Sequence, residues 1–213
     1  GVVFNINAVI GTEHGCVWPG DTDDNTTVNN WDLLPIALAF GQTGISRPNA
    51  TINWIGQSSQ DGSNTNAVQG LPANKHIDCN GDGGLNQNDI AAIQQNYGNS
   101  YYRDGSSLSG NIPFFIQPET AYEGQQLSLP IHLGTSVQRA DTVYGVAFTI
   151  NYDPQIIDAS TVSVNFQNSW LGTNLINISH NFEQLGKIEV AVARTDRVNV
   201  SGFGEIGELN VTV

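Results

Sequence analysis

The first ten residues of the chain divide into an apolar face and a mixed face. In an extended strand successive side chains point to opposite sides, so residues two positions apart share a face. β-Branched and aromatic residues, which favour strands, are frequent in this segment. We therefore predict a strand over residues 1–10 with one buried face, which consists of Val2, Phe4, Ile6, Ala8 and Ile10.

Helical patterns are confined to two short segments, and an acidic, turn-rich loop precedes each of them. The apolar run over residues 33–41 predicts one short helix, and the run over 90–98 predicts another. The connection between them is polar and rich in Gly, Asn and Ser. From residue 112 to 213, apolar and polar residues alternate between Gly, Asn and Asp-Pro turn signals, which predicts an all-β region.

These patterns divide the chain into four parts. The predicted parts are a strand at 1–10, a module of two loops and helices at 11–103, a linker at 104–111 and a β domain at 112–213. The linker is rich in Ser and Gly, a composition typical of flexible connections. The fold class we expect is mainly β with a small α module.

The two acidic loops and their helices form an internal repeat. Asp21 and Asp78 begin the two loops and lie 57 positions apart. The same separation relates nine further pairs of similar residues: Asp23 and Asn80, Asn25 and Asp82, Val28 and Leu85, Asn29 and Asn86, Asp32 and Asp89, Leu33 and Ile90, Ile36 and Ile93, Phe40 and Tyr97, Gly41 and Gly98. Chance does not preserve so many positions in one register.

The repeated loops carry oxygen ligands at the alternating spacing of an EF-type calcium loop. The ligands expected in the first loop are Asp21, Asp23, Asn25, the Thr27 carbonyl, Asn29 and Asp32. The ligands expected in the second loop are Asp78, Asn80, Asp82, the Gly84 carbonyl, Asn86 and Asp89. Hard oxygen ligands suit Ca²⁺ and do not suit zinc or copper. The sequence therefore predicts two Ca²⁺ sites.

The loops differ at the sharp turn, where an EF-type loop needs glycine. Gly83 occupies that position in the second loop, whereas Thr26 occupies it in the first. We expect a more strained turn and weaker calcium binding in the first loop. The alternative interpretation of either loop is a solvated acidic turn whose last carboxylate caps a helix.

One helix directly follows each loop, and the last loop ligand is Asp. In these features residues 15–99 resemble the dockerin type of duplicated half EF-hand, which occurs in secreted bacterial assemblies. The chain departs from that family in its long connection between the repeats and in Pro35, which is tolerated only in the first turn of a helix or at a kink. Dockerins bind cohesins through their helices, but the altered helix faces do not support that role here.

The dockerin-like fold brings its two loops together around a pseudo-twofold axis. That arrangement places Cys16, just before the first loop, near Cys79 in the second. Because paired cysteines are usual in exported proteins, we predict a Cys16–Cys79 disulfide, and two free thiols are the alternative.

The β region resembles cohesin domains, which are antiparallel β-sandwiches of jelly-roll type. The resemblance rests on GVAFTINYDP at 145–154, GKIEVAVA at 186–193 and SGFGEIGELNV at 201–211. Cohesin-like sandwiches continue for at least one more strand, whereas this chain stops at Val213 inside a predicted strand. We therefore expect a sandwich that lacks an edge strand, and an unpaired edge is an association site.

The strand over residues 1–10 could complete such a sandwich. Insertion into the next molecule would be β-augmentation, and repeated head-to-tail contacts of that kind build open filaments. The two alternatives are pairing with the chain's own sandwich and a frayed terminus.

Composition narrows the classes of partner and the compartment. Seven basic residues against twenty acidic ones give a net charge of −13, and this excludes nucleic acid as a partner because phosphate binding needs clustered Lys and Arg. No apolar run is long enough to span a bilayer, so we expect no membrane insertion. Few Lys, many Asn, Thr, Gly and Ser, and two Cys favour an extracellular location.

The sequence contains no recognisable catalytic motif, and the scattered His and Glu residues form no pair that the sequence singles out. We expect a non-enzymatic structural protein that binds copies of itself. The alternative is a monomeric adhesion or scaffold module that binds a polysaccharide or a surface protein, with the Trp side chains as candidate sugar platforms.

Several positions match glycosylation signals. Asparagine signals occur at Asn49, Asn177, Asn199 and Asn210, as well as at the expected ligand Asn25. Thr142 lies in the tripeptide Asp-Thr-Val, which resembles a short O-glycosylation signal of secreted bacterial proteins. We expect any attached sugar to lie on the surface.

Overall fold

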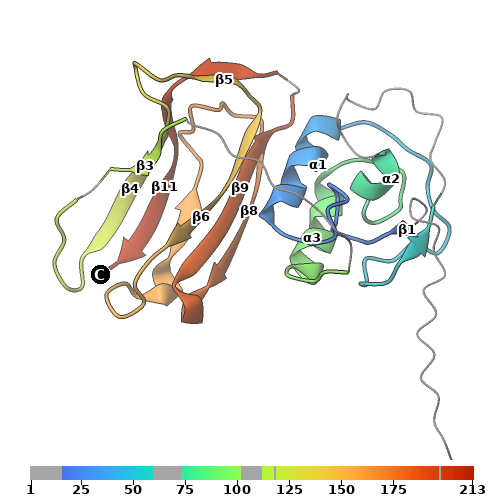
Figure 1. Cartoon of the computed structure of the whole chain (residues 1–213), viewed down its shortest axis with the longest axis horizontal. Helices are drawn as coiled ribbons and strands as arrows, with labels where there is room; N and C mark the ends of the chain where they lie inside the picture. The colour runs from blue at the N-terminus through green and yellow to red at the C-terminus, as the bar shows by residue number, and fades with distance from the viewer. Residues whose placement is uncertain (1–15, 60–72, 102–111, 118, 197) are drawn as a thin grey trace, which may run out of the picture.

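The computed structural model of the chain describes residues 16–59, 73–101, 112–117, 119–196 and 198–213. This part of the chain is mainly β, with antiparallel sheets and a small helical part beside them, as Figure 1 shows. The predicted strand at 1–10 and the predicted linker at 104–111 lie outside the described residues. Among the described residues, no helix has the length and apolar character needed to cross a membrane.

The helical module, which we define as residues 16–59 and 73–101, contains two short helices close to the predicted positions. Pro35 is the third residue of the first of them, within its first turn, where a missing N–H breaks no helical hydrogen bond. The sequence did not predict the short helix α2. The elements are β1 (Cys16–Val17), η1 (Asn30–Asp32), α1 (Leu33–Ala39), β2 (Gln57–Ser58), α2 (Asn74–Ile77), η2 (Gln87–Asp89) and α3 (Ile90–Asn96).

The two repeats of the helical module exchange equivalent backbone hydrogen bonds. Val28 N donates to Asn99 O at 2.9 Å, and Val28 O accepts from Gly98 N at 2.8 Å. In the other repeat, Leu85 N donates to Gln42 O at 3.0 Å, and Leu85 O accepts from Gly41 N at 2.8 Å. Each loop is therefore held against the end of the other repeat's helix, which gives the module a pseudo-twofold arrangement.

The rest of the described chain forms two facing antiparallel sheets. One sheet has the order β3-β4-β11-β7 and the other has the order β6-β9-β8, while β5 and β10 pair separately. The elements are β3 (Phe114–Ile116), β4 (Gln126–Leu133), β5 (Ala140–Val143), β6 (Gly145–Asn151), η3 (Ala159–Thr161), β7 (Ser163–Asn165), β8 (Leu175–Phe182), η4 (Glu183–Leu185), β9 (Lys187–Arg194), β10 (Val200–Gly202) and β11 (Gly204–Thr212).

One hydrophobic cluster lies between these two sheets, as expected for period-two strands with one buried face. Val146, Phe148 and Ile150 of β6 point into it, opposite Val190 and Val192 of the central strand β9, among others. We call the side of the three-stranded sheet that faces this cluster its inner face.

A second cluster joins the helical module to the outer face of the same sheet. Ile176 and Ile178 of β8 are buried there with Ala191 and Ala193 of β9, against helix α1 and its neighbours. Burying a side chain as large as isoleucine contributes about 2 kcal/mol. The helical module and the two facing sheets, which we call the sandwich, therefore share a hydrophobic cluster. Figure 1 shows α1 lying along β8 and β9.

Candidate metal centre

The first acidic loop brings three carboxylates together. One oxygen from each of Asp21, Asp23 and Asp32 lies within 4.8 Å of the other two, so the cluster could hold a metal ion. Asp21 and Asp32 are fully buried, and Asp23 is half-buried. Asp32 is the last residue of η1, immediately before α1, so the start of the helix fixes its position.

Backbone amides hold these carboxylates in place. Asp21 accepts hydrogen bonds from Asn25 N at 2.9 Å and from Thr26 N at 3.0 Å. Asp32 accepts from Thr22 N and from Asn29 N, both at 2.7 Å. The loop therefore closes around its own acidic side chains, and these N–H groups hold the carboxylates in position.

The remaining expected ligands of the first loop line the same turn. Asn25 is exposed, and its Nδ2 donates to Asp23 Oδ2 at 2.8 Å. Asn29 Nδ2 lies 3.4 Å from the Thr27 carbonyl oxygen, while Asn29 Oδ1 accepts from Trp31 N at 2.7 Å. Asn29 thus caps η1 in addition to its expected role near an ion, and with Asp32 it forms a capping box.

The second loop repeats this hydrogen-bond pattern. Asp78 accepts from Gly81 N at 2.8 Å and from Gly83 N at 3.1 Å. Asp89 accepts from Asn86 N at 2.9 Å, as Asp32 does from Asn29 in the first loop.

The other expected ligands of the second loop also contact one another. Asn80 Nδ2 donates to Asp82 Oδ2 at 2.9 Å, and Asn86 Nδ2 donates to the Gly84 carbonyl at 2.9 Å. Within the described residues, a close group of three acidic, His or Cys ligands occurs only in the first loop. Each loop has three Asp residues among its expected ligands, but the second loop has Asn80 where the first has Asp23 and Asp82 where the first has Asn25.

Electrostatics favour a cation at both loops. Burial, together with the negative charge of Asp21, raises the pKa of Asp23 to about 6. Burial also raises the pKa of Asp32 well above its usual range, with the charge of Asp23 adding to the effect. In the second loop burial raises the pKa of Asp89 to about 6. A bound cation would relieve this repulsion and favour the ionised carboxylates.

Arg47 is a contact of the second loop that the sequence did not predict. Its guanidinium donates to the carbonyl oxygens of Lys75 at 2.7 Å and Asp78 at 2.8 Å. Burial raises the pKa of Asp78, and the positive charge of Arg47 opposes that shift. No motif marks Arg47, because it comes from the polar connection between the repeats and reaches the loop only through the fold.

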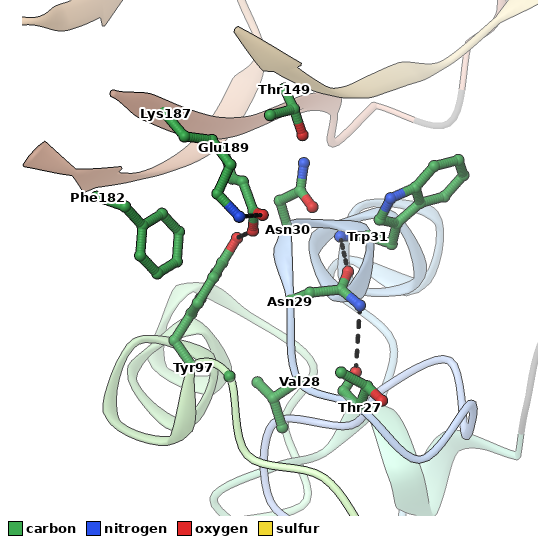
Figure 2. Close-up of a pocket in the computed structure, with 11 residues that line it drawn as sticks. Thr27, Val28, Asn29, Asn30, Trp31, Tyr97, Thr149, Phe182, Lys187 and Glu189 are labelled. Atoms are coloured by element: carbon green, nitrogen blue, oxygen red, sulfur yellow. Dashed lines mark hydrogen bonds and ion pairs between the residues drawn. The ribbon is translucent and has the colours of Figure 1, made fainter. Parts of the chain in front are cut away.

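The first loop also contacts the sandwich, through a residue that the sequence did not single out. Asn30 is buried, and its Nδ2 donates to Val190 O at 2.8 Å and to Phe148 O at 3.1 Å. Figure 2 shows the Asn30 side chain pointing away from η1 toward the strands. The equivalent residue of the second repeat, Gln87, is exposed. Only the first of the two loops therefore docks on the sheet through this position.

A pocket of about 370 Å³ lies beside this junction, between the first loop and the outer face of the sheet. In Figure 2 Tyr97 points across it toward Glu189, and Tyr97 Oη donates to Glu189 Oε2 at 2.6 Å. Lys187 Nζ lies 2.7 Å from Glu189 Oε1. Trp31 lines the same pocket with 52% of its surface exposed.

The pairing of the two cysteines concerns one buried side chain and one outside the described residues. Cys79 is a buried free thiol in the structure, with its Sγ 3.6 Å from His76 O, and burial raises its pKa well above the usual range. The backbone of Cys16 pairs with Ser58 in the short β1–β2 sheet. The side chain of Cys16 lies outside the described part of the structure, so the Cys16–Cys79 disulfide stays a prediction.

The glycosylation candidates lie at accessible positions. Asn49, Thr142, Asn177 and Asn199 are exposed, and Asn210 is half-buried in β11. Thr142, in strand β5, has a positive φ of 55°, a backbone conformation that is uncommon for residues with a side chain.

The chain matches no protein-family model and no curated protein.

Proposed function

We propose that this chain is an extracellular, non-enzymatic structural protein whose copies assemble head to tail into a filament or surface layer. In this proposal the N-terminal strand of one copy, residues 1–10, enters the β-sandwich of the next. The observation that carries the proposal is the position of β1, from which the N-terminal segment departs. Strand β1 lies on the side of the helical module that faces away from the sandwich (Figure 1).

This position makes pairing with the chain's own sandwich difficult. Six Cα–Cα steps separate position 10 from Cys16, and they extend over at most about 22 Å. Helices α1 and α3 lie between β1 and the three-stranded sheet in Figure 1. With its side chains each helix is about 10–12 Å across, so the two helices together are about 20–24 Å thick. A second copy therefore accounts for the apolar strand better than the same copy does.

We further propose that the helical module is a dockerin-type calcium module with two Ca²⁺ sites. All the expected ligands are oxygen atoms, and the buried carboxylates of Asp21 and Asp32 crowd around one point, which is a donor set suited to a hard dication. Calcium binding would order the loops, and the contact of Asn30 with β6 and β9 would fix the module on the sandwich. Titration calorimetry after chelator treatment should show about two bound ions per chain.

The sandwich fits a cohesin-like, jelly-roll domain in our proposal. Support comes from its two antiparallel sheets and from the long pairing of β4 with β11 and of β6 with β9. A cohesin-like sheet that carries a dockerin-like module on its outer face would make the subunit one rigid block. Such a block is suited to a filament, because flexible joints would not keep a constant rotation between neighbours.

Assembly can be tested with two matched double variants in the N-terminal segment. Phe4→Ser with Ile6→Ser removes the centre of the apolar face, whereas Asn5→Ser with Asn7→Ser changes only the other face. We expect the first variant to remain monomeric in negative-stain images and in sedimentation, and the second to assemble as the wild type does. Filaments of unchanged length and number in the first variant, or in a chain lacking residues 1–10, would refute the proposed function.

A second candidate function is binding of a polysaccharide by a monomeric adhesion module. The half-exposed Trp31 at the rim of the 370 Å³ pocket favours it, because aromatic faces beside polar side chains suit sugar rings. Glycan-array binding that Trp31→Ala abolishes, in a chain that stays monomeric, would support this candidate over assembly.

A further inference from the structure

The two outer strands of the three-stranded sheet differ in what they offer to a partner. Strand β6 pairs only with β9 among the described residues. Arg194 N donates to Tyr144 O at 2.7 Å, and Tyr152 N donates to Gly186 O at 2.7 Å. In the antiparallel pair, the backbone N–H and C=O groups of the even-numbered β6 residues between Tyr144 and Tyr152 therefore point to β9. The backbone N–H and C=O groups of Ala147 and Thr149 therefore point away from the sheet.

The inner face of β6 is apolar along its whole length. Val146, Phe148 and Ile150 form this row, and Val146 and Phe148 are only partly buried. The segment GVAFTIN contains no charged residue and no proline, which are the usual means of protecting an open edge. Strand β6 is thus an unprotected edge with an apolar row beside it.

Strand β8, at the opposite edge of the same sheet, has an inner row that is polar after its first residue, Leu175. Asn177 and Ser179 are exposed there, and Asn181 bonds to Ala159 O at 2.8 Å. The buried isoleucines of β8 face the helical module instead. An added apolar strand would consequently gain little at β8 and much at β6.

The facing sheet leaves an apolar seam beside β6. Strand β3 covers only the second half of β4, from Ile131 to Leu133, so Leu127 and Leu129 in its first half remain partly exposed. Phe114 of β3 contacts Phe148 of β6, with ring centroids 4.9 Å apart, and still keeps 37% of its surface exposed. These side chains from both sheets border the same seam.

We propose that the edge of β6 is the acceptor for residues 1–10 of a second copy, an inference that rests on the proposed function and locates its contact. The segment repeats apolar side chains every second residue, as the inner row of β6 does. An added strand would place Val2, Phe4, Ile6, Ala8 and Ile10 in the seam. Ten extended residues reach about 33 Å and β6 about 23 Å, so the segment is long enough to cover the whole edge.

The composition of the segment fits a dry seam. None of its ten side chains is charged, so burial of the segment would leave no charged group without a partner. Its backbone groups would pair with the outward N–H and C=O groups of β6, which is how strand addition acquires its main-chain hydrogen bonds. The outer face of the segment, with Asn5 and Asn7, would lie beside the exposed Thr149.

The test uses proline at matched outward-facing positions of the two edges in the full-length chain. Thr149→Pro removes an N–H that points away from β9 and blocks an added strand, while the bonds between β6 and β9 stay. Ser179→Pro makes the same change on β8. We expect Thr149→Pro to remain monomeric by sedimentation and electron microscopy, and Ser179→Pro to assemble as the wild type does. Thermal unfolding of both variants checks that they fold.

The outcomes separate this inference from the proposed function. If Thr149→Pro assembles normally while Phe4→Ser with Ile6→Ser does not, strand donation stands and the β6 acceptor is wrong. If Thr149→Pro fails to fold, amide hydrogen exchange of the wild type decides. Assembly should then slow exchange at Ala147 and Thr149 about tenfold or more and leave Asn177 and Ser179 unchanged. Unchanged exchange at Ala147 and Thr149 in the assembled state would overturn the proposal.

Discussion

Asn30 and Val190 are 160 positions apart in the sequence, and the Nδ2 atom of Asn30 lies 2.8 Å from the carbonyl oxygen of Val190. The contact is buried, because only 3% of the Asn30 surface is exposed. Asn30 also immediately follows Asn29, an expected calcium ligand in the first loop. The order of that loop and its attachment to the sandwich are therefore linked through adjacent residues.

This contact predicts unequal effects of equivalent substitutions in the two repeats. Asn30→Ala should lower the free energy of unfolding by about 1–3 kcal/mol, since it removes a buried donor shared by two carbonyl oxygens. Gln87→Ala, at the matching exposed position, should change it by less than about 0.5 kcal/mol. Urea unfolding at saturating calcium measures both values. Equal effects would show that Asn30 does not hold the module on the sheet.

The first loop should gain stability from glycine at its sharp turn. Thr26 has a φ of 83°, close to the 87° of Gly83 at the matching position, and this backbone conformation is costly for a residue with a side chain. Thr26→Gly should therefore raise the free energy of unfolding by about 1 kcal/mol and tighten calcium binding at the first loop. Gly83→Ala is the converse variant and should weaken the second loop. Calorimetric titration of both variants tests the pair, and a weaker first site in Thr26→Gly would contradict the strain argument.

Calcium binding should weaken in acid. Without metal, burial raises the pKa of Asp23 and of Asp89 to about 6, whereas in the unfolded chain Asp titrates near about 3.9. The folded metal-free chain thus holds protons that the unfolded chain releases, so its stability falls as pH rises from about 4 to about 6. Because calcium must displace these protons, affinity should drop below about pH 6 and binding should release protons there. Titrations in buffers of different ionisation enthalpy at about pH 5.5 and about pH 7.5 measure both effects, and equal affinity with no proton release would refute this prediction.

The second repeat contacts the sheet through Tyr97, and the contribution of this contact to the free energy of unfolding should be measurable separately from that of Asn30. Tyr97 Oη donates to Glu189, and its ring stacks on His180 with centroids 4.6 Å apart. Tyr97→Phe keeps the stacking and removes the bond to a charged acceptor, so it should cost about 1 kcal/mol. Tyr152→Phe removes a hydrogen bond of 2.7 Å to the neutral side chain of Asn181, so it should cost less. A larger loss in Tyr152→Phe would mean that the Tyr97–Glu189 bond does not fasten the module.

Local patterns in the sequence were sufficient to locate the loops and helices. The predicted helices over 33–41 and 90–98 correspond to α1 at Leu33–Ala39 and α3 at Ile90–Asn96, because each follows a loop whose last Asp begins the helix. The proximity of Asp21, Asp23 and Asp32 also follows from the spacing within one loop. Contacts between residues that are close in the sequence can be predicted directly from the order of the residues.

Other features had no local signal. The short helix α2 and the contact of Arg47 with the second loop arise in a polar connection that has no apolar periodicity. The burial of Asn30 could not be separated from the exposure of Gln87, because both are polar residues at equivalent loop positions. Only contact with a distant strand makes them different.

The sequence by itself determined the repeat, the two loops rich in side-chain oxygen atoms, the mainly β class and the alternating apolar segment at residues 1–10. Tertiary structure decided that the first repeat docks on β9 and that the isoleucines of β8 face the helices. It also decided that β6, whose inner row is apolar, pairs on one side only within the described part of the chain. The physical reason is that ligand spacing and strand periodicity depend on neighbours within a few residues. Which face is covered, and which edge stays open, depends on how segments more than a hundred positions apart pack together.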